Sequence, residues 1–403
     1  MTTTTLTQHG AAAADAQTVD VVATARELRE LLRTEAPAGD SGQCSQTVVD
    51  ALESGGLLAL TTPARYGGSE VSTRTLIEVL IELARGDGSA AWSAMLINIG
   101  NWFTSTWPLQ AQDEIWGRDP HAKTAAIINP MTKAEKVEGG YRLSGKWPFA
   151  SGSYIATHSI IGFLAPQADG SFRHVMGIVH PGEWTVEKSW VPIGLKGTGS
   201  DTIVVDDVFM PDHRVQDFGE MVEGRVLTEA FDDEVQARAA FLPKGTIIFG
   251  AMQVGMAKAI AELALERIKN KGVTGTRYTE ARNSPTHQLS AADGSTRIDL
   301  AEMLALRAAD SIDDYAERGE VMPEVLRARV RNDTGMIVTL AGEAIDSLMK
   351  SAGTSSYLQT SPMSRILADH LTGGSHAHAT PQVGREVYGR LLVGADGDVT
   401  VDV

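Results

Sequence analysis

Residues 139–152 read GGYRLSGKWPFASG, and this segment decides the fold that we expect around it. Two short runs of alternating character flank the turn pair Gly139-Gly140, which is typical of a β-hairpin. The second run places Trp147 and Phe149 two residues apart, so both rings are expected on one face of an extended strand. Small and hydroxyl residues follow directly, at positions 150–153.

An aromatic wall followed by a polar loop suits a planar ring system with polar edges, such as a flavin. Trp147 and Phe149 would supply the apolar surface. Ser151, Gly152 and Ser153 would supply hydroxyls and bare backbone N–H groups along one edge of the ring. An ordinary hairpin with two buried aromatic side chains explains the same segment, because aromatic pairs are common in strands.

The composition is that of a globular protein with room for two or three structural units, since the chain has 403 residues and 43% of them are hydrophobic. The chain carries 35 Lys and Arg against 51 Asp and Glu, a net charge of −16, so nucleic acid and anionic membranes are not expected as partners. The single cysteine, Cys44, excludes an internal disulfide and a cysteine-rich metal site, and it fits a cytoplasmic location. No metal is expected. The chain has no run of 18 apolar residues, so no transmembrane helix is expected either.

Hydrophobic periodicity divides the chain into parts. Residues 1–17 are rich in Thr and Ala and lack a signal-peptide pattern, which predicts a disordered tail. Residues 18–120 show helical spacing, with helices expected over 73–85 and 90–106. Residues 121–218 hold about six short runs separated by Gly, Pro or Asp, which predicts an antiparallel sheet or small barrel.

The last part, 219–403, is predicted to be helical again. Long amphipathic patterns cover 245–271, 295–318 and 323–352, and a polar loop is expected over 272–294. Three long helices and two shorter ones are able to form an antiparallel four-helix bundle. The fold class is therefore mainly α with a central β domain.

Four motifs in this order resemble the acyl-CoA dehydrogenase fold. The motifs are PARYGG at 63–68, ELARGDGSAAW at 82–92, the segment at 139–152, and GLKGTGSD at 194–201 leading into VVDDVFMP at 204–211. The resemblance implies an N-terminal helical domain, a middle β-barrel and a C-terminal bundle that assembles as a homotetramer. A shared fold does not determine the chemistry.

Dehydrogenases of this fold use a glutamate base, in many members within a Tyr-Glu-Gly-Thr-like motif. Here Ala377 stands at that position, and a methyl group cannot abstract a proton. Other relatives carry the base on an earlier helix, but residues 241–256 include no carboxylate, and Glu234 lies just before them. An acyl-CoA dehydrogenase-like flavin oxidoreductase remains an alternative that rests on the fold alone.

The segment around His376 instead resembles the flavin-dependent monooxygenases of this fold. His376 follows Asp369 by seven residues, and Tyr388-Gly389-Arg390 comes after it, whereas Ala368 departs from the usual Arg. The resemblance implies the oxygenase component of a two-component monooxygenase, which forms a C4a-hydroperoxyflavin from O₂ and reduced FMN or FAD. A separate NAD(P)H-dependent flavin reductase would supply that flavin, since the sequence has no Gly-x-Gly-x-x-Gly after a strand.

The substrate implied is a small aromatic or polycyclic compound, and N-hydroxylation of the nitrososynthase type is an alternative. Ser151 is the catalytic candidate beside flavin N5, with Ser153 as second choice. His376 is the candidate for accepting a phenol proton, because a histidine pKa near 6.5 suits that task. His378 is its rival and, with His158, a substrate-binding candidate.

Simpler interpretations exist for each of these residues. Surface loop residues or a metal site are the alternative for the histidines of 370–378, and a turn hydroxyl is the alternative for Ser151. The resemblance implies that Arg282 contacts the flavin phosphate of a neighbouring subunit, although a solvated arginine is equally consistent with the sequence. A scaffold that has lost the chemistry is the non-enzymatic alternative.

Overall fold

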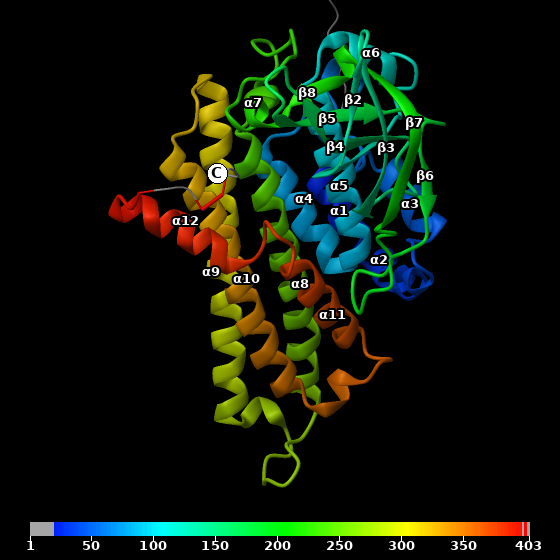
Figure 1. Ribbon diagram of the computed structural model, residues 1–403. Coiled ribbons are helices and arrows are strands. Elements are labelled where there is room, and N and C mark those ends of the chain that lie inside the picture. Colours follow the sequence, from blue (N-terminus) through cyan, green and yellow to red (C-terminus); the bar gives the residue numbers. More distant parts are fainter. Residues whose placement is uncertain (1–19, 397–398, 401–403) are drawn as a thin grey trace, which may run out of the picture.

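The computed structural model describes residues 20–396 and 399–400, so the predicted tail at 1–17 lies outside the described residues. The chain runs from helices through two sheets to a long helical bundle, which confirms the predicted fold class (Figure 1). The sheets and the N-terminal helices lie together at one end, and the bundle extends away from them.

The N-terminal part is helical, as predicted. Asp87 adopts an extended conformation that ends one helix, and it caps the next. The second of these two helices is buried on nearly all sides, which explains its apolar sequence. The helices are α1 (Val21–Glu27), α2 (Arg29–Glu35), α3 (Gln46–Ser54), α4 (Thr73–Gly86), α5 (Gly88–Ser105) and α6 (Leu109–Ile115).

The middle part forms two four-stranded sheets with the strand orders β1-β4-β5-β8 and β2-β3-β7-β6. The predicted hairpin is confirmed, but its turn is formed by Glu138 and Gly139 rather than by Gly139-Gly140, because Gly140 already pairs with Val137. The expectation of six antiparallel strands is wrong in detail: the described residues form eight strands, and β1 runs parallel to β4. The strands are β1 (Thr124–Lys133), β2 (Glu135–Val137), β3 (Gly140–Ala150), β4 (His158–Pro166), β5 (Phe172–Val179), β6 (Thr185–Glu187), β7 (Asp201–Pro211) and β8 (Val215–Asp217).

The C-terminal part is the predicted bundle, with one boundary corrected. The second long helix begins at Pro285 rather than near 295, so the loop before it is shorter than expected. The polar, Gly-containing segment was misleading because Gly294 lies inside the helix, where a Cβ would stand 2.8 Å from Leu348 of the neighbouring helix. The helices are α7 (Phe218–Val222), α8 (Phe241–Asn270), α9 (Pro285–Arg318), α10 (Glu324–Ala352), α11 (Pro362–Gly374) and α12 (Pro381–Val393).

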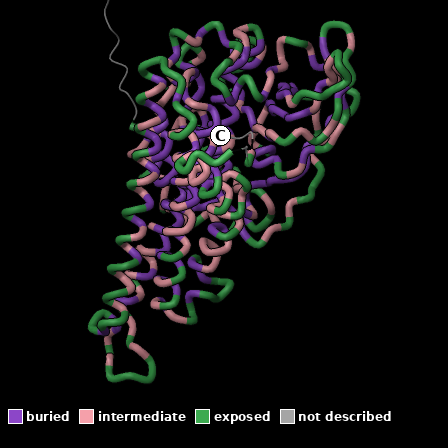
Figure 2. The backbone as a smooth tube through the Cα atoms, turned by 60° about the vertical axis from the view of Figure 1, so that its left-hand side comes forward, coloured by how far each residue is buried: buried purple, intermediate pink, exposed green. Residues whose placement is uncertain are grey.

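Helix α8 connects the bundle to the rest of the protein. It packs against α4, α9, α10 and α11. By length and composition it is apolar enough to cross a membrane, but 78% of its most apolar window is buried inside the protein. Buried segments follow the interior of the bundle and continue into the region of the sheets (Figure 2). This burial is what a core helix shows, and it brings α8 against α5 at the site described next.

Candidate active site

The first turns of α5 position an indole at the junction of the three parts of the chain. Asp87 Oδ2 accepts a hydrogen bond from Ala90 N at 2.9 Å, which fixes the start of the helix. Trp92 follows and is 6% exposed. Its ring centroid lies 5.3 Å from that of Phe249 on α8 and 6.0 Å from that of His376, beyond α11.

The hydroxyl of Ser151, just after β3, contacts the same indole. Trp92 Nε1 donates a hydrogen bond to Ser151 Oγ at 3.1 Å. Ser151 Oγ also lies 2.6 Å from Ser200 Oγ, which lies 2.6 Å from Thr198 Oγ1. Trp92, Ser200 and Thr198 were not predicted as site residues, although all three stand within the motifs at 82–92 and 194–201.

The direction of these hydroxyl bonds follows from the last partner. Thr198 Oγ1 donates to the carbonyl oxygen of Leu195 at 2.9 Å, because a carbonyl can only accept. Ser200 must therefore donate to Thr198, and Ser151 must donate to Ser200. Ser151 Oγ already accepts from Trp92, so one lone pair remains free to accept a further hydrogen bond.

His376 is buried against two aromatic rings. Its imidazole stacks on Phe249 with a centroid distance of 4.2 Å and an interplanar angle of 23°. Burial, together with the neighbouring His378, lowers the pKa of His376 to about 3. The expectation of a pKa near 6.5 is therefore wrong for this arrangement, because a buried imidazolium loses its hydration.

The loop after α11 fixes the tautomer of this imidazole. His378 N donates a hydrogen bond to His376 Nδ1 at 3.3 Å, so in the neutral ring the proton sits on Nε2. His376 thus presents a hydrogen-bond donor rather than a basic nitrogen. His378 itself is buried, its pKa is lowered to about 4 by burial and by Arg331, and its Nδ1 has no hydrogen-bond partner among the described residues.

Two buried carboxyl groups connect the elements that carry these residues. Asp369 on α11 accepts a hydrogen bond from Leu195 N at 2.5 Å. Burial and the nearby Asp87 raise the pKa of Asp369 to about 7. Burial also raises the pKa of Asp87, the cap of α5. The helix that carries Trp92, the loop that carries Thr198 and the helix before His376 therefore meet at this pair.

The predicted aromatic wall is wrong. Trp147 is fully buried between the two sheets, and its Nε1 donates to the carbonyl of Gly162 at 2.7 Å. Phe149 is 69% exposed and contacts Trp190 edge-on at 6.1 Å. A register shift between Trp147 and Ala150, with a positive φ at Phe149, breaks the alternation that would put both rings on one face. Phe149 remains a cofactor-binding candidate, whereas Trp147 serves the core.

The expected bare N–H groups are not found in the loop either. The backbone N–H of Ser151 donates to Phe149 O, that of Gly152 to Thr198 O, and that of Ser153 to Ala150 O. The hydroxyl of Ser153 donates to Gly199 O at 3.1 Å, so this residue serves the loop itself. Gly152 has a φ of +77°, which favours glycine and lets the turn close tightly.

The other two candidates lie apart from Ser151 and His376. The ring of His158 contacts His180 at 4.8 Å, and burial and that neighbour lower its pKa to about 4. Its predicted contact with substrate gains no support from this placement. Arg282 is exposed in the loop between α8 and α9 and pairs with Glu280 at 2.6 Å. That loop lies at the end of the bundle far from the sheets, so a role for Arg282 at a neighbouring subunit's flavin stays a prediction (Figure 1).

The site fits a reduced flavin in its hydrogen-bonding chemistry. Reduced flavin carries a proton on N5, and Ser151 Oγ keeps one lone pair to accept it. Gln253 on α8 is fully buried, and its Nε2 is a donor with no hydrogen-bond partner among the described residues. It lies near Trp92, since a Cβ at Gly373 would stand 2.9 Å from Trp92 and 3.2 Å from Gln253 Nε2. Phe149, two residues before Ser151, exposes an apolar ring that a flavin would cover.

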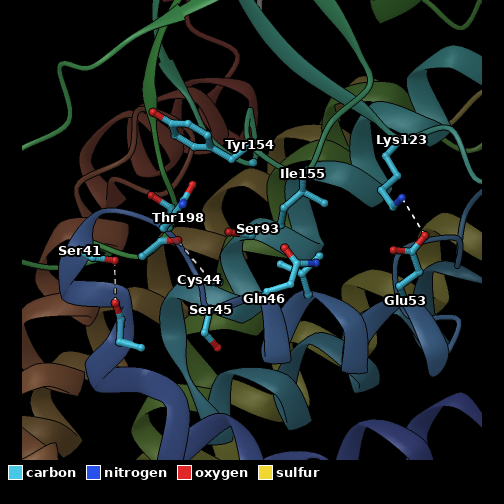
Figure 3. Close-up of a pocket in the computed structure, with 15 residues that line it drawn as sticks. Ser41, Cys44, Ser45, Gln46, Glu53, Ser93, Lys123, Tyr154, Ile155 and Thr198 are labelled. Atoms are coloured by element: carbon cyan, nitrogen blue, oxygen red, sulfur yellow. Dashed lines mark hydrogen bonds and ion pairs between the residues drawn. The ribbon is translucent and has the colours of Figure 1, made fainter.

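A polar pocket of about 470 Å³ borders the hydroxyl chain (Figure 3). Its walls include Ser93 of α5, Gly152 and Thr198, which adjoin or belong to the site just described. Across the pocket lie Cys44, whose Sγ donates to Gly197 O at 3.3 Å, and Gln46 of α3.

Comparisons with known proteins define the class of this protein. The sequence model described as acyl-CoA dehydrogenase, N-terminal domain, matches residues 18–116, and the acyl-CoA dehydrogenase, C-terminal domain, matches 247–381. Together the two matches cover more than half of the chain. The chain belongs to the acyl-CoA dehydrogenase family, as the resemblance implied.

Among its relatives are oxygenase components of flavin-dependent enzymes. The chain is 29% identical to the flavin-dependent monooxygenase, oxygenase subunit HsaA, of Rhodococcus jostii (84% of this chain, 89% of the relative). It is 26% identical to the p-hydroxyphenylacetate 3-hydroxylase, oxygenase component, of Acinetobacter baumannii (96% and 93%). The structure of XiaF from Streptomyces sp. with FADH2 and glycerol superposes with a TM-score of 0.89 at 29% identity (95% and 97%).

Proposed function

We propose that this chain is the oxygenase component of a two-component flavin-dependent monooxygenase that hydroxylates a small aromatic substrate. The observation that carries the proposal is the meeting of Ser151 and His376 on the ring of Trp92. The relatives named above support it, because they are oxygenase subunits or components by name. An NAD(P)H-dependent reductase would deliver the flavin.

The bound reduced flavin would supply the activation of O₂ and the transferable oxygen atom. Ser151 would hold the N5 proton through its free lone pair. Trp92 and Phe249 would exclude water, which protects the reactive oxygen from loss as peroxide. Both rings are buried, at 6% and 4% exposure.

His376 would act on the substrate as a hydrogen-bond donor. Its Nδ1 is occupied by His378 N–H, and burial keeps the ring neutral at pH 7. A neutral Nε2–H directed at a phenol oxygen stabilises the phenolate, in which the ring is the better nucleophile. The phenol proton would pass to solvent water as the substrate binds as its phenolate.

The dehydrogenase alternative lacks its base in this site. Residues 241–256 of α8 contain no carboxylate, and Glu234, which lies just before them, forms an ion pair with Arg65. Ala377 follows His376 in the segment where a glutamate would be required. N-hydroxylation would use the same residues, so the choice between carbon and nitrogen depends on the substrate supplied.

We also propose that the protein is a cytoplasmic homotetramer, in which Arg282 contacts a neighbouring subunit's flavin phosphate. The exposure of Arg282 and its single acidic neighbour, Glu280, leave it accessible to another chain. Light scattering that gives the mass of a monomer would contradict the tetramer.

The test mixes the protein anaerobically with photoreduced FMN or FAD and then adds oxygen in a stopped-flow spectrometer. A transient absorbance distinct from both reduced and oxidised flavin is expected, and Ser151→Ala should shorten it. Ser171→Ala, in an exposed turn closed by Asp169, is the matched control. Flavin that reoxidises at the rate of free flavin would contradict the proposal.

A further inference from the structure

The hydroxyl chain that begins at Ser151 ends at a pocket open to solvent. Ser151, Ser200 and Thr198 are linked by two oxygen–oxygen contacts of 2.6 Å, short enough for proton transfer between hydroxyls. Ser151 is 9%, Ser200 4% and Thr198 2% exposed, so all three residues are largely buried. Thr198 also lines the pocket of about 470 Å³ (Figure 3).

The pocket has the properties of a water-filled inlet. Hydroxyl and amide side chains line it, among them Ser41, Gln43 and Gln46, which are exposed at its rim. A pocket of this volume with several polar partners holds ordered water. The pair Lys123 and Glu53, 2.9 Å apart, lies at one side of it.

We propose that Ser151, Ser200 and Thr198 form a proton path between the flavin face of the active site and this pocket. The inference rests on the proposed function, because hydroxylation of the substrate and release of water require a proton to leave flavin N5. Among the hydrogen bonds of the described residues, only this chain of hydroxyls connects Ser151 Oγ to the pocket.

The net result is the transfer of one proton to the water of the pocket, and each hydroxyl is neutral before and after the transfer. Ser151 Oγ gains the proton from flavin N5 as its own proton passes to Ser200 Oγ. The Ser200 proton passes to Thr198 Oγ1, and the Thr198 proton passes to a water of the pocket. For this last step, Thr198 Oγ1–H turns from Leu195 O towards the pocket. That carbonyl keeps the hydrogen bond from Trp190 Nε1 at 2.9 Å, so it is not left unpaired.

Ser200 and Thr198 would act through Ser151. Substitutions distinguish this role in proton transfer from support of the loop alone. Thr198→Val keeps the shape of the side chain and removes its hydroxyl. Thr198→Ser keeps the hydroxyl and removes only a methyl group. Ser200→Ala interrupts the path in its middle. Ser41→Ala removes a hydroxyl at the pocket rim that takes no part in the path and bonds only to Ala38 O.

The experiment follows exchange of the N5 proton with water by NMR, using full-length protein in anaerobic complex with photoreduced FMN or FAD labelled with ¹⁵N at N5. Thr198→Val and Ser200→Ala should slow exchange on the order of a hundredfold, as for loss of a positioned proton-transfer group. Thr198→Ser and Ser41→Ala should exchange as the wild type does. The affinity for reduced flavin and the thermal unfolding of each variant are measured alongside.

The outcomes separate the path from the function on which it rests. Exchange at the wild-type rate in both Thr198→Val and Ser200→Ala would overturn the proton path and leave the monooxygenase proposal standing. Slow exchange in Thr198→Ser as well would also overturn it, since that variant retains the hydroxyl. Failure of the wild type to bind reduced flavin would overturn the proposed function, and the path with it.

Discussion

Trp92 Nε1 donates a hydrogen bond to Ser151 Oγ at 3.1 Å, although the two residues are 59 positions apart in the chain. One belongs to a buried helix and the other to the loop after a strand. The bond occupies one lone pair of the serine oxygen. The Ser151 hydroxyl in turn donates its hydrogen bond to Ser200 Oγ. Ser151 is thereby left as an acceptor, which is the role that a proton on flavin N5 requires.

Trp92→Phe should remove one hydrogen bond from the site and keep an aromatic ring there. The ring is retained but the N–H donor is lost, so the stability should fall by about 1 kcal/mol. The oxygen-dependent transient should also shorten, because Ser151 loses one of the two bonds that orient it. Urea unfolding and stopped-flow absorbance measure the two effects. Trp184→Phe is the matched control, since Trp184 Nε1 has no hydrogen-bond partner among the described residues. Equal transients in wild type and Trp92→Phe would contradict the orienting role.

His376→Gln and His376→Ala distinguish a hydrogen-bond donor from a base. The glutamine amide places an N–H near the position of Nε2, whereas alanine places nothing there. If His376 donates, we expect alanine to lower the hydroxylation rate on the order of a hundredfold and glutamine to lower it by only about tenfold. A base cannot be replaced by an amide, so equal losses in both variants would favour proton abstraction.

His378→Gln decides between the two histidines. His378 lies beside His376 at a ring distance of 5.8 Å but does not share the contact with Trp92. We therefore expect its loss to change the hydroxylation rate less than the loss of His376 does. A larger loss in His378→Gln, measured with the same substrate, would transfer the role to His378.

The protein should lose stability in mild acid. Burial lowers the pKa to about 3 or 4 for the histidines His158, His180, His370, His376 and His378. Since a histidine in the unfolded chain has a pKa near 6.5, the unfolded state binds more protons as the pH falls below that value. Each such histidine then costs up to about 1.4 kcal/mol per pH unit, until the pH reaches its folded pKa.

Asp369 contributes to the pH dependence of stability with the opposite sign. Its pKa is raised to about 7 in the folded state. Between its unfolded pKa and pH 7 the folded protein therefore binds more protons at this group, and a fall in pH stabilises the folded state. Burial also raises the pKa of Asp87 and of Asp333, which act in the same direction as Asp369. The five histidines outnumber these three carboxyl groups, and the net stability should decline from about pH 6.5 towards pH 4. Urea unfolding at a series of pH values measures the slope, and His370→Gln should reduce it. A slope of zero across this range would contradict the burial of the neutral histidines.

Gly100 and Gly245 should respond oppositely to alanine. Gly100 of α5 approaches β1 so closely that a Cβ would stand 1.9 Å from Thr124 O, whereas a Cβ at Gly245 of α8 meets nothing within 4 Å. Gly100→Ala should therefore cost several kcal/mol, roughly 3 or more, by forcing the helix off the sheet. Gly245→Ala should stabilise the protein by about 0.5–1 kcal/mol. Thermal unfolding of the two variants tests whether α5 and β1 are in backbone contact.

Local sequence determined the elements and their order. Helical periodicity, the Gly-Gly turn and the spacing of short apolar runs depend on neighbours within a few residues, so they predicted the helical, β and helical parts and the hairpin. Even the segment around His376 could be singled out, because its motif is contiguous. The start of α9 at Pro285 could not be predicted, since the reason for a glycine inside that helix, the close approach of Leu348 to Gly294, lies in another helix.

Only the tertiary structure decided which side chains are buried and which contact one another. A register shift after Trp147 put one ring in the core and the other at the surface, and a strand pattern of period two cannot signal such a shift. Trp92, Ser151, Ser200 and His376 come from four separate segments, and their contacts depend on how α5, α8, α11 and the sheets pack. The low pKa values of the histidines arise from that packing as well, because desolvation is a property of the folded surroundings and not of the residue type.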